Sequence, residues 1–98
     1  MTKGGSIYIL TNYPRKTVLY VGVTSDLKHR IYQHKTGEYK NSFADRFNCK
    51  TLVYYESFHY IEEAISREKQ IKGGSRKSKL DLINKMNPEW KELFDELV

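Results

Sequence analysis

Five polar side chains have the types and the spacing that phosphodiester chemistry requires. They are Tyr8, Tyr20, Arg30, His34 and Glu68. The planar fork of an arginine matches phosphate oxygens, a histidine titrates near neutral pH, and a carboxylate holds a divalent cation. In such a set the ion and the arginine stabilise developing negative charge, and a tyrosine or histidine handles the proton of the attacking water.

Glu68 gives the clearest signal because it interrupts an apolar stripe. The stripe belongs to a helix predicted over 60–72 and consists of Ile61, Ala64, Ile65, Glu68 and Ile71. A buried carboxylate without a partner costs ~several kcal/mol or becomes protonated. A metal ion or a basic partner would explain it, and so would a structural salt bridge to Arg30 or to a lysine.

The other four residues have ordinary explanations as well. Arg30 and His34 lie one turn apart on a predicted helix, where they either point at one phosphate or form a solvated surface. Tyr8 and Tyr20 lie on two predicted strands, where tyrosines mostly serve packing. Gly22 weakens its strand unless another group must approach the backbone closely.

The elements that position these residues follow from hydrophobic pattern and turn chemistry. The sequence predicts strands over 7–11 and 17–23, joined as a hairpin, and a third strand over 51–58. It predicts helices from the N-cap Ser25 to about 35, over 60–72 and over 78–86. Residues 36–48 are expected to be a loop with at most one helical turn. The fold class is α/β of the α+β type, in the order β-β-α-β-α-α-α.

A last amphipathic helix is expected from about 88 to 98, after a core of about 5–86. Asn87 would cap it and Pro88 would take its first position. Its apolar stripe, which should be buried against the body, consists of Trp90, Leu93, Phe94 and Leu97.

Length and composition indicate one domain in a reducing compartment. The 98 residues are 39% hydrophobic and 30% charged, and the longest apolar run is far short of the ~20 residues that a membrane span needs. No apolar signal-peptide core stands at the N-terminus. Cys49 is the only cysteine, which excludes an internal disulfide and a cysteine-rich zinc site. The expected location is the cytoplasm.

The charge distribution favours a polyanionic partner, although solubility alone would also explain it. The net charge is +5, and residues 89–98 contain four acids and one base, so the first 88 residues carry +8. Phosphate contacts made by such cations do not read bases, so little sequence specificity is expected. The basic face is predicted to comprise Arg15, Lys16, Lys28, Lys35, Lys40 and Lys72.

Four separate elements together resemble a GIY-YIG nuclease domain over nearly the whole chain. The two signature triplets appear as residues 6–8 (Ser-Ile-Tyr) and 20–22 (Tyr-Val-Gly). Arg30 and His34 match the family's arginine and the residue one turn later, and residues 64–68 match the segment with its metal-binding glutamate. The chain is most similar to the small, stand-alone bacterial members. The resemblance implies a small three-stranded antiparallel sheet flanked by helices.

The resemblance also implies roles for the residues. Tyr8 would be the general base or would position the water, Tyr20 would orient the water or the scissile phosphate, and Gly22 would allow a close approach. Arg30 would stabilise the transition state, and His34 would assist proton transfer or contact the phosphate. Glu68 would bind one Mg²⁺ or Mn²⁺ ion.

The function implied is a divalent-metal-dependent DNA endonuclease of little sequence specificity, acting on duplex or branched DNA in repair or recombination. A protein partner could supply targeting. The alternative is a nucleic-acid-binding module with a retained but inactive cleft. Lys28, Lys35 and Lys72 would contact DNA. Ser6 replaces the first glycine of the signature, and neither Asn84 nor Asn87 is assigned to the late asparagine of many relatives.

Overall fold

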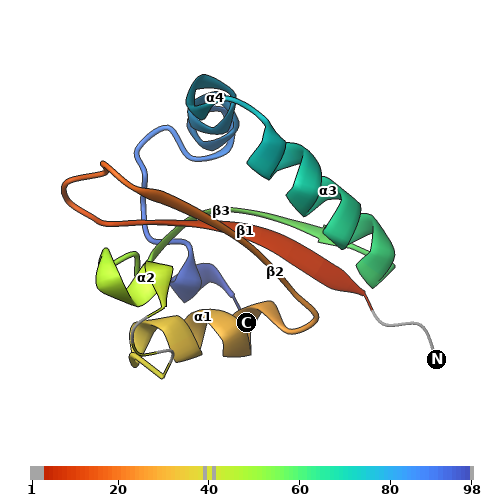
Figure 1. Cartoon of the computed structure of the whole chain (residues 1–98), viewed down its shortest axis with the longest axis horizontal. Coiled ribbons are helices and arrows are strands. Elements are labelled where there is room, and N and C mark those ends of the chain that lie inside the picture. The colour runs from red at the N-terminus through yellow and green to blue at the C-terminus, as the bar shows by residue number, and fades with distance from the viewer. Residues whose placement is uncertain (1–3, 39, 41, 98) are drawn as a thin grey trace.

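Three antiparallel strands form the centre of the fold. The computed structural model describes residues 4–38, 40 and 42–97. Strands β1 (Gly5–Thr11), β2 (Leu19–Thr24) and β3 (Thr51–Phe58) form one sheet in the order β2-β1-β3 (Figure 1). The predicted α+β class with a three-stranded antiparallel sheet is confirmed, and the third strand has the predicted bounds.

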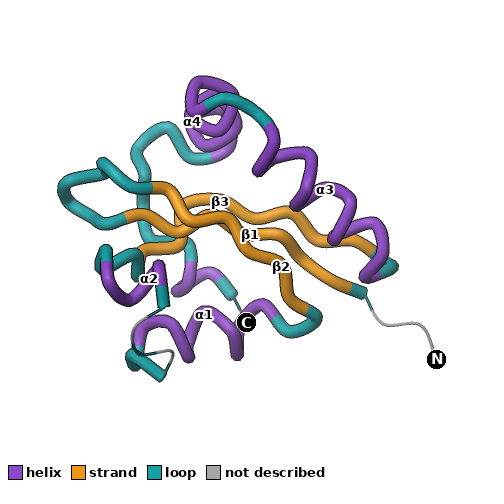
Figure 2. The backbone as a smooth tube through the Cα atoms, in the orientation of Figure 1, coloured by secondary structure: helices purple, strands orange, loops and turns teal. Residues whose placement is uncertain are grey.

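Four helices and one 3-10 turn complete the described chain (Figure 2). They are α1 (Leu27–Lys35), α2 (Phe43–Arg46), α3 (Ile61–Gly73), α4 (Arg76–Met86) and the 3-10 turn η1 (Phe94–Glu96). The element order is therefore β-β-α-α-β-α-α followed by η1. The four residues of α2 are the single helical turn expected within residues 36–48, and the predicted order is corrected at the C-terminal end. Among the described residues, no helix is long and apolar enough to cross a membrane.

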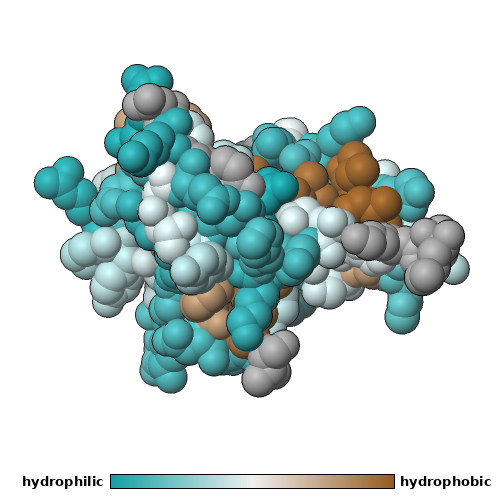
Figure 3. All heavy atoms as spheres, turned by 90° about the horizontal axis from the view of Figure 1, so that it is seen from below, coloured by the Kyte–Doolittle hydropathy of each residue, from teal (hydrophilic) through white to brown (hydrophobic). Residues whose placement is uncertain are grey.

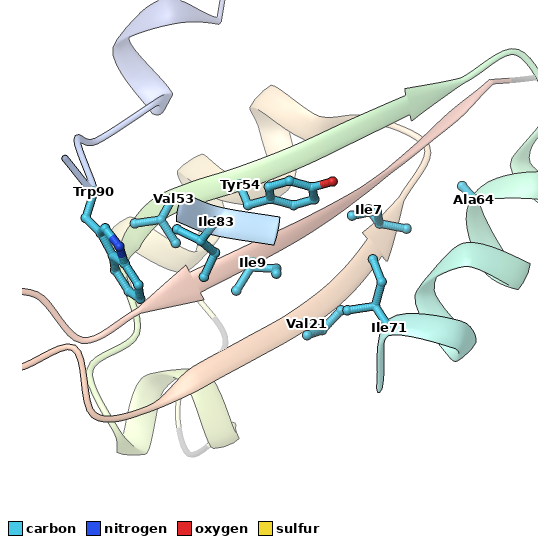
Figure 4. Close-up of a cluster of buried hydrophobic side chains, with 9 residues drawn as sticks. All are labelled: Ile7, Ile9, Val21, Val53, Tyr54, Ala64, Ile71, Ile83 and Trp90. Carbon is cyan, nitrogen blue, oxygen red and sulfur yellow. The ribbon is translucent and has the colours of Figure 1, made fainter. Parts of the chain in front are cut away.

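The sheet divides the core into two layers. Ile7, Ile9 and Val21 project to the side covered by α3 and α4, where they join Ile83 and other apolar side chains (Figure 4). The alternate residues of β1, Tyr8 and Leu10, project to the side covered by α1 and α2. Each layer therefore receives one set of side chains from the same strand, as the period of a β-strand requires.

Helix α1 begins one residue later than predicted, because Asp26 and not Ser25 is its N-cap. The Asp26 carboxylate accepts a hydrogen bond from the His29 N–H at 3.2 Å. The Thr24 hydroxyl in turn accepts a hydrogen bond from the Asp26 N–H at 3.0 Å. These local bonds fix the turn from β2 into α1, and with it the position of the helix beneath the sheet.

The predicted amphipathic helix over 88–98 is wrong within the described residues. Only η1 is helical there, and Trp90 has a φ of 55°, outside the helical region. Trp90 is buried in the α3/α4 layer, whereas Leu93 is buried in the α1/α2 layer. Trp90 and Leu93 are thus buried as expected, but on opposite sides of the sheet, which a single helical stripe cannot achieve. Phe94 and Leu97 are only partly buried.

Glu92 attaches this C-terminal segment to the rest of the fold. Its carboxylate accepts hydrogen bonds from the Leu52 N–H at 2.8 Å and the Phe94 N–H at 3.2 Å, and it forms an ion pair with Lys35. The Leu93 N–H donates to the Leu52 carbonyl at 2.8 Å. The segment therefore covers the first part of β3, an edge strand whose backbone groups would otherwise be open to pairing.

We expect the substitution Glu92→Ala to lower the free energy of unfolding by about 1–3 kcal/mol. The reason is that it leaves the buried N–H of Leu52, a fully buried residue, without its acceptor. Urea unfolding followed by circular dichroism measures the change as a shift of the midpoint.

Glu89→Ala is the matched control in the same segment. Glu89 is exposed and pairs only with the exposed Lys91 among the described residues, so its loss should change stability by less than ~0.5 kcal/mol. Equal midpoints for the two variants would show that Glu92 does not anchor the segment.

Candidate active site

Tyr8 and Gly22 face each other across the β1–β2 pair, and the glycine makes room for the ring. A Cβ atom built on Gly22 would lie 2.4 Å from both Cζ and Oη of Tyr8. Real Cβ atoms do not approach that closely, so any other residue would displace the tyrosine. The tight approach expected at Gly22 is therefore an approach by the Tyr8 ring.

The Tyr8 ring is fully buried and meets His34 of α1. Tyr8 Oη and His34 Nε2 are 3.1 Å apart, a hydrogen bond between two buried side chains. The ring of Tyr20 on β2 closes the cluster, with centroids 6.3 Å from Tyr8 and 5.6 Å from His34. Three of the five candidate residues thus form one cluster on the α1 side of the sheet.

The fourth candidate, Arg30, affects this cluster electrostatically. Burial lowers the pKa of His34 below its usual value, and the positive charge of Arg30, one turn earlier on α1, lowers it further. His34 is therefore neutral at pH 7 and keeps one ring nitrogen as a hydrogen-bond acceptor.

Exposure separates these four residues into an inner and an outer pair. Tyr8 and His34 are buried, whereas Tyr20 and Arg30 are only partly buried. A substrate approaching this side would meet Tyr20 and Arg30 first. The buried Tyr8 hydroxyl lies behind these two residues and bonds to His34.

The fifth candidate, Glu68, lies on α3 in the other layer. Its side chain is 14% exposed, and its carboxylate forms an ion pair with Lys72 at 3.1 Å. The predicted stripe of α3 is correct for Ala64 and Ile71, which are buried, and wrong for Ile65, which is 38% exposed. Of the two salt-bridge partners considered for Glu68, Arg30 and a lysine, the structure shows a lysine.

The rotation of α3 directs Glu68 toward β2. Ala64 and Ile71 define the line of α3 that contacts the sheet. Arg67 lies on the β3 side of this line and forms an ion pair with Glu56, with an N–O distance of 3.0 Å. Successive helical residues are rotated by ~100°, so Glu68 leaves the opposite side of that line from Arg67. Since β2 is the edge strand opposite β3, Glu68 is on the side of β2.

Glu68 could hold a divalent ion only if water and substrate supplied most of the other ligands of the ion. Among the described residues, no three His, Cys, Asp or Glu side chains are grouped so that they could hold a metal ion. Mg²⁺ nevertheless binds through one or two carboxylates while keeping several waters and substrate phosphates. The ammonium of Lys72 at 3.1 Å shows that the carboxylate already neutralises a cation in this position.

The predicted basic face is divided between surface and internal contacts. Lys28 and Lys40 are exposed, as are Arg15 and Lys16 in the β1–β2 loop. Lys35 differs, because its ammonium binds Glu92 and donates to the Lys50 carbonyl at 2.7 Å. The geometry therefore gives Lys35 a structural role in the α1/α2 layer.

Both unassigned asparagines make contacts that stabilise the C-terminal segment. The side-chain amide of Asn87 donates to the Val53 carbonyl at 3.1 Å, and its oxygen accepts from the Lys91 N–H at 3.0 Å. It follows α4 as the C-cap residue and does not begin a helix. Asn84 accepts a hydrogen bond from the Trp90 indole at 2.7 Å.

Sequence reasoning missed one neighbour of the cluster. Phe43 of α2 stacks on Tyr20, with centroids 6.2 Å apart and ring planes inclined by 23°. The available signal was an aromatic residue repeated at 43 and 47 within a polar stretch, which places both side chains on one face of a helical turn.

Comparison with known proteins identifies the family of this chain. A family model described as the GIY-YIG catalytic domain matches residues 4–87. A UPF0213 protein of Syntrophus aciditrophicus is 37% identical over 71 residues, which are 72% of this chain and 80% of that protein. A UPF0213 protein of Clostridium perfringens is 42% identical over 66 residues, 67% of this chain and 70% of the relative.

A solved structure extends the similarity to the fold. The solution NMR structure of a UPF0213 protein from Bacillus halodurans superimposes with a TM-score of 0.54 at 25% identity, covering 91% of this chain and 92% of that one. The matched family model includes both triplets, the α1 residues and Glu68. The chain belongs to the GIY-YIG catalytic-domain family and, within it, to the UPF0213 proteins.

Proposed function

We propose that this protein is a divalent-metal-dependent DNA endonuclease that hydrolyses phosphodiester bonds with little sequence specificity. The observation that carries the proposal is the cluster in which the neutral His34 binds the Tyr8 hydroxyl behind the partly exposed Tyr20 and Arg30. Membership of the GIY-YIG family supports a nuclease and a nucleic-acid substrate in general terms.

The scissile phosphate would lie along the edge of β2. The α1 layer supplies Tyr20 and Arg30, and Glu68 leaves α3 on the β2 side, so the two layers can meet one phosphate only where the sheet ends (Figure 1). A site at an edge also leaves room for a polymer that continues in both directions.

Each residue would have one task. The planar guanidinium of Arg30 would bind the phosphate oxygens and stabilise the charge that develops on them. Tyr20 would orient the phosphate or the attacking water. The Tyr8–His34 pair would hold Tyr20 in place and accept a proton at His34, which is neutral at pH 7. Glu68 would hold the Mg²⁺ or Mn²⁺ ion, which supplies a Lewis acid when bound.

A second candidate function is nucleic-acid binding without useful cleavage. The observation that favours it is the ion pair between Glu68 and Lys72, because this pair accounts for the carboxylate in the apolar stripe without a metal. A cleavage assay with Mg²⁺ or Mn²⁺ on linear, flapped and branched DNA separates the two functions.

The variant Glu68→Gln should lose cleavage by at least ~10²-fold while remaining folded and bound to DNA. The amide keeps the shape of the side chain but is a poor ligand for Mg²⁺, and the loss of a metal Lewis acid removes several kcal/mol of transition-state stabilisation. Cleavage is measured with Mg²⁺ and Mn²⁺, and binding is measured in a chelator.

Glu63→Gln is the control for this variant, because Glu63 is on the exposed side of the same helix. It should cut at the wild-type rate. Near wild-type cleavage by Glu68→Gln would remove Glu68 from the site and leave the metal unassigned.

Arg30→Lys should reduce turnover by ~10²-fold with a smaller change in DNA affinity. Lysine keeps the positive charge, and with it the effect on His34, but lacks the planar fork that matches the charge distribution of the transition state. Single-turnover rates and binding constants are compared with those of Arg76→Lys, whose arginine on α4 binds the Lys16 carbonyl. A loss confined to affinity would make Arg30 an ordinary phosphate contact.

The lowered pKa of His34 predicts a loss of both stability and activity in acid. The unfolded chain takes up a proton as the pH falls through ~6.5, whereas the folded protein does so only at lower pH. This contribution to the free energy of unfolding is therefore complete above pH ~6.5 and is lost as the pH falls toward the lowered pKa. Cleavage should fall as the ring becomes charged and can no longer accept a proton.

His34→Gln should remove this part of the pH dependence from both urea unfolding and the cleavage rate. His29→Gln, an exposed histidine on the same helix, should leave both profiles unchanged. Identical profiles for wild type and His34→Gln would show that His34 does not titrate in this range.

A further inference from the structure

Two exposed phenylalanines extend the aromatic cluster away from Tyr20. Phe43 stacks on Tyr20, and Phe47 follows with its ring centroid 4.7 Å from that of Phe43. Phe43 is 51% exposed and Phe47 is 45% exposed. The cluster therefore continues as a row of rings from the buried Tyr8 to open solvent.

The short helix α2 holds these rings outward. Ser42 caps it by accepting a hydrogen bond from the Asp45 N–H at 3.2 Å. Ala44 is buried in the α1/α2 layer, and its carbonyl accepts a hydrogen bond from the N–H of the buried Cys49 at 2.8 Å. Although Phe43 packs on Tyr20, an anchored backbone thus leaves a large part of both rings open to water, where they form an apolar patch that a ligand could cover.

Phe47 also borders a hollow of about 590 Å³ between α2 and the β1–β2 loop. The loop side contributes Tyr13 and Arg15, and the α2 side contributes Arg46. None of the described residues that line the hollow is acidic. The nearest carboxylate of α2, Asp45, is 4.0 Å from the ammonium of Lys50, which offsets its charge.

We propose that Phe43 and Phe47 form a stacking platform for unpaired nucleotides of DNA, and that the Arg15 and Arg46 hollow holds the adjoining phosphates. The inference rests on the proposed nuclease function and names the substrate class that the site selects. Aromatic rings that alternate with cations are the surface on which single strands bind, because every base has a face that can stack.

The charge of this region favours a nucleic acid over an apolar protein partner. A partner helix or peptide would cover the two phenylalanines but would leave Arg15 and Arg46 without counter-charges. The face of the molecule that is seen from below in Figure 1 is mostly hydrophilic, and its apolar residues gather in separate patches (Figure 3). A duplex keeps its bases stacked inside and cannot use the rings, so the platform discriminates in favour of gaps, flaps and single strands.

The test measures binding in a chelator, where no cleavage occurs. Three fluorescent DNAs of one sequence are compared at one salt concentration: a continuous duplex, the same duplex with a short single-stranded gap, and the gap strand alone. Wild-type protein should bind the gapped and single-stranded DNAs more tightly than the duplex. Phe47→Ala should lose roughly tenfold in affinity for these two and little for the duplex.

Phe43→Leu provides a second variant that keeps apolar contact with Tyr20 but removes the aromatic face. It should also lose most of the preference for unpaired DNA, with an unchanged melting temperature. Tyr60→Ala is the matched control, since Tyr60 is an aromatic residue of similar exposure (49%) at the start of α3. A 2-aminopurine base in the gap should be quenched by wild type and by Tyr60→Ala, and less by Phe47→Ala.

The outcomes separate the platform from the nuclease. Equal affinity for the three DNAs, or unchanged preference and quenching in both phenylalanine variants, would overturn the platform while leaving a nuclease that acts on duplex. Binding to none of the three DNAs would overturn the platform and the proposed function together. If a gap strand made of RNA raised the affinity over that for the duplex by as much as DNA does, the platform would stand but its restriction to DNA would be overturned.

Discussion

The close contact between Tyr8 and Gly22 determines how the rest of the site is built. The two residues are opposite each other in the sheet, and only the missing side chain of the glycine lets the tyrosine ring lie this close to β2. The ring is then fully buried and its hydroxyl reaches His34, which fixes α1 beneath the sheet. Tyr20 and Arg30 take their places around this pair, so the signature glycine shapes the candidate site by positioning an aromatic ring.

The position of β2 at one edge of the sheet would let two separate layers contribute to the proposed site. The carboxylate belongs to the α3 layer and the arginine to the α1 layer, and a central strand would keep them apart. The other edge, β3, is used differently. Its first part is covered by the segment that Glu92 attaches, and Arg67 binds Glu56 further along. One edge is therefore closed by internal contacts, while the other remains available for a substrate.

Local sequence signals predicted much of this arrangement. Alternation and β-branched residues predicted the strands, and the apolar period predicted α3 and α4 to within two residues. The type and number of candidate site residues also followed from the sequence. The segment after Met86 was predicted wrongly because its apolar spacing suits a helix, whereas Asn87 and Glu92 bond to β3 and send Trp90 and Leu93 to opposite faces. Such long-range hydrogen bonds leave no periodic trace in a sequence.

The same limit applies to charges, and it changes how the net charge should be interpreted. A count of residues makes the last ten an acidic tail and treats Lys35 as part of a basic face. In the structure Glu92 forms an ion pair with Lys35, so part of the acidic end is used inside the fold. The positive charge left at the surface lies mainly in two regions: the β1–β2 loop, with the exposed Arg15 and Lys16, and α4, where the exposed Arg76, Lys77 and Lys85 outnumber Asp81. Only the loop borders the hollow beside Phe47, so attraction for a polyanion is not confined to the candidate site, and the rings must supply the selectivity that charge alone does not.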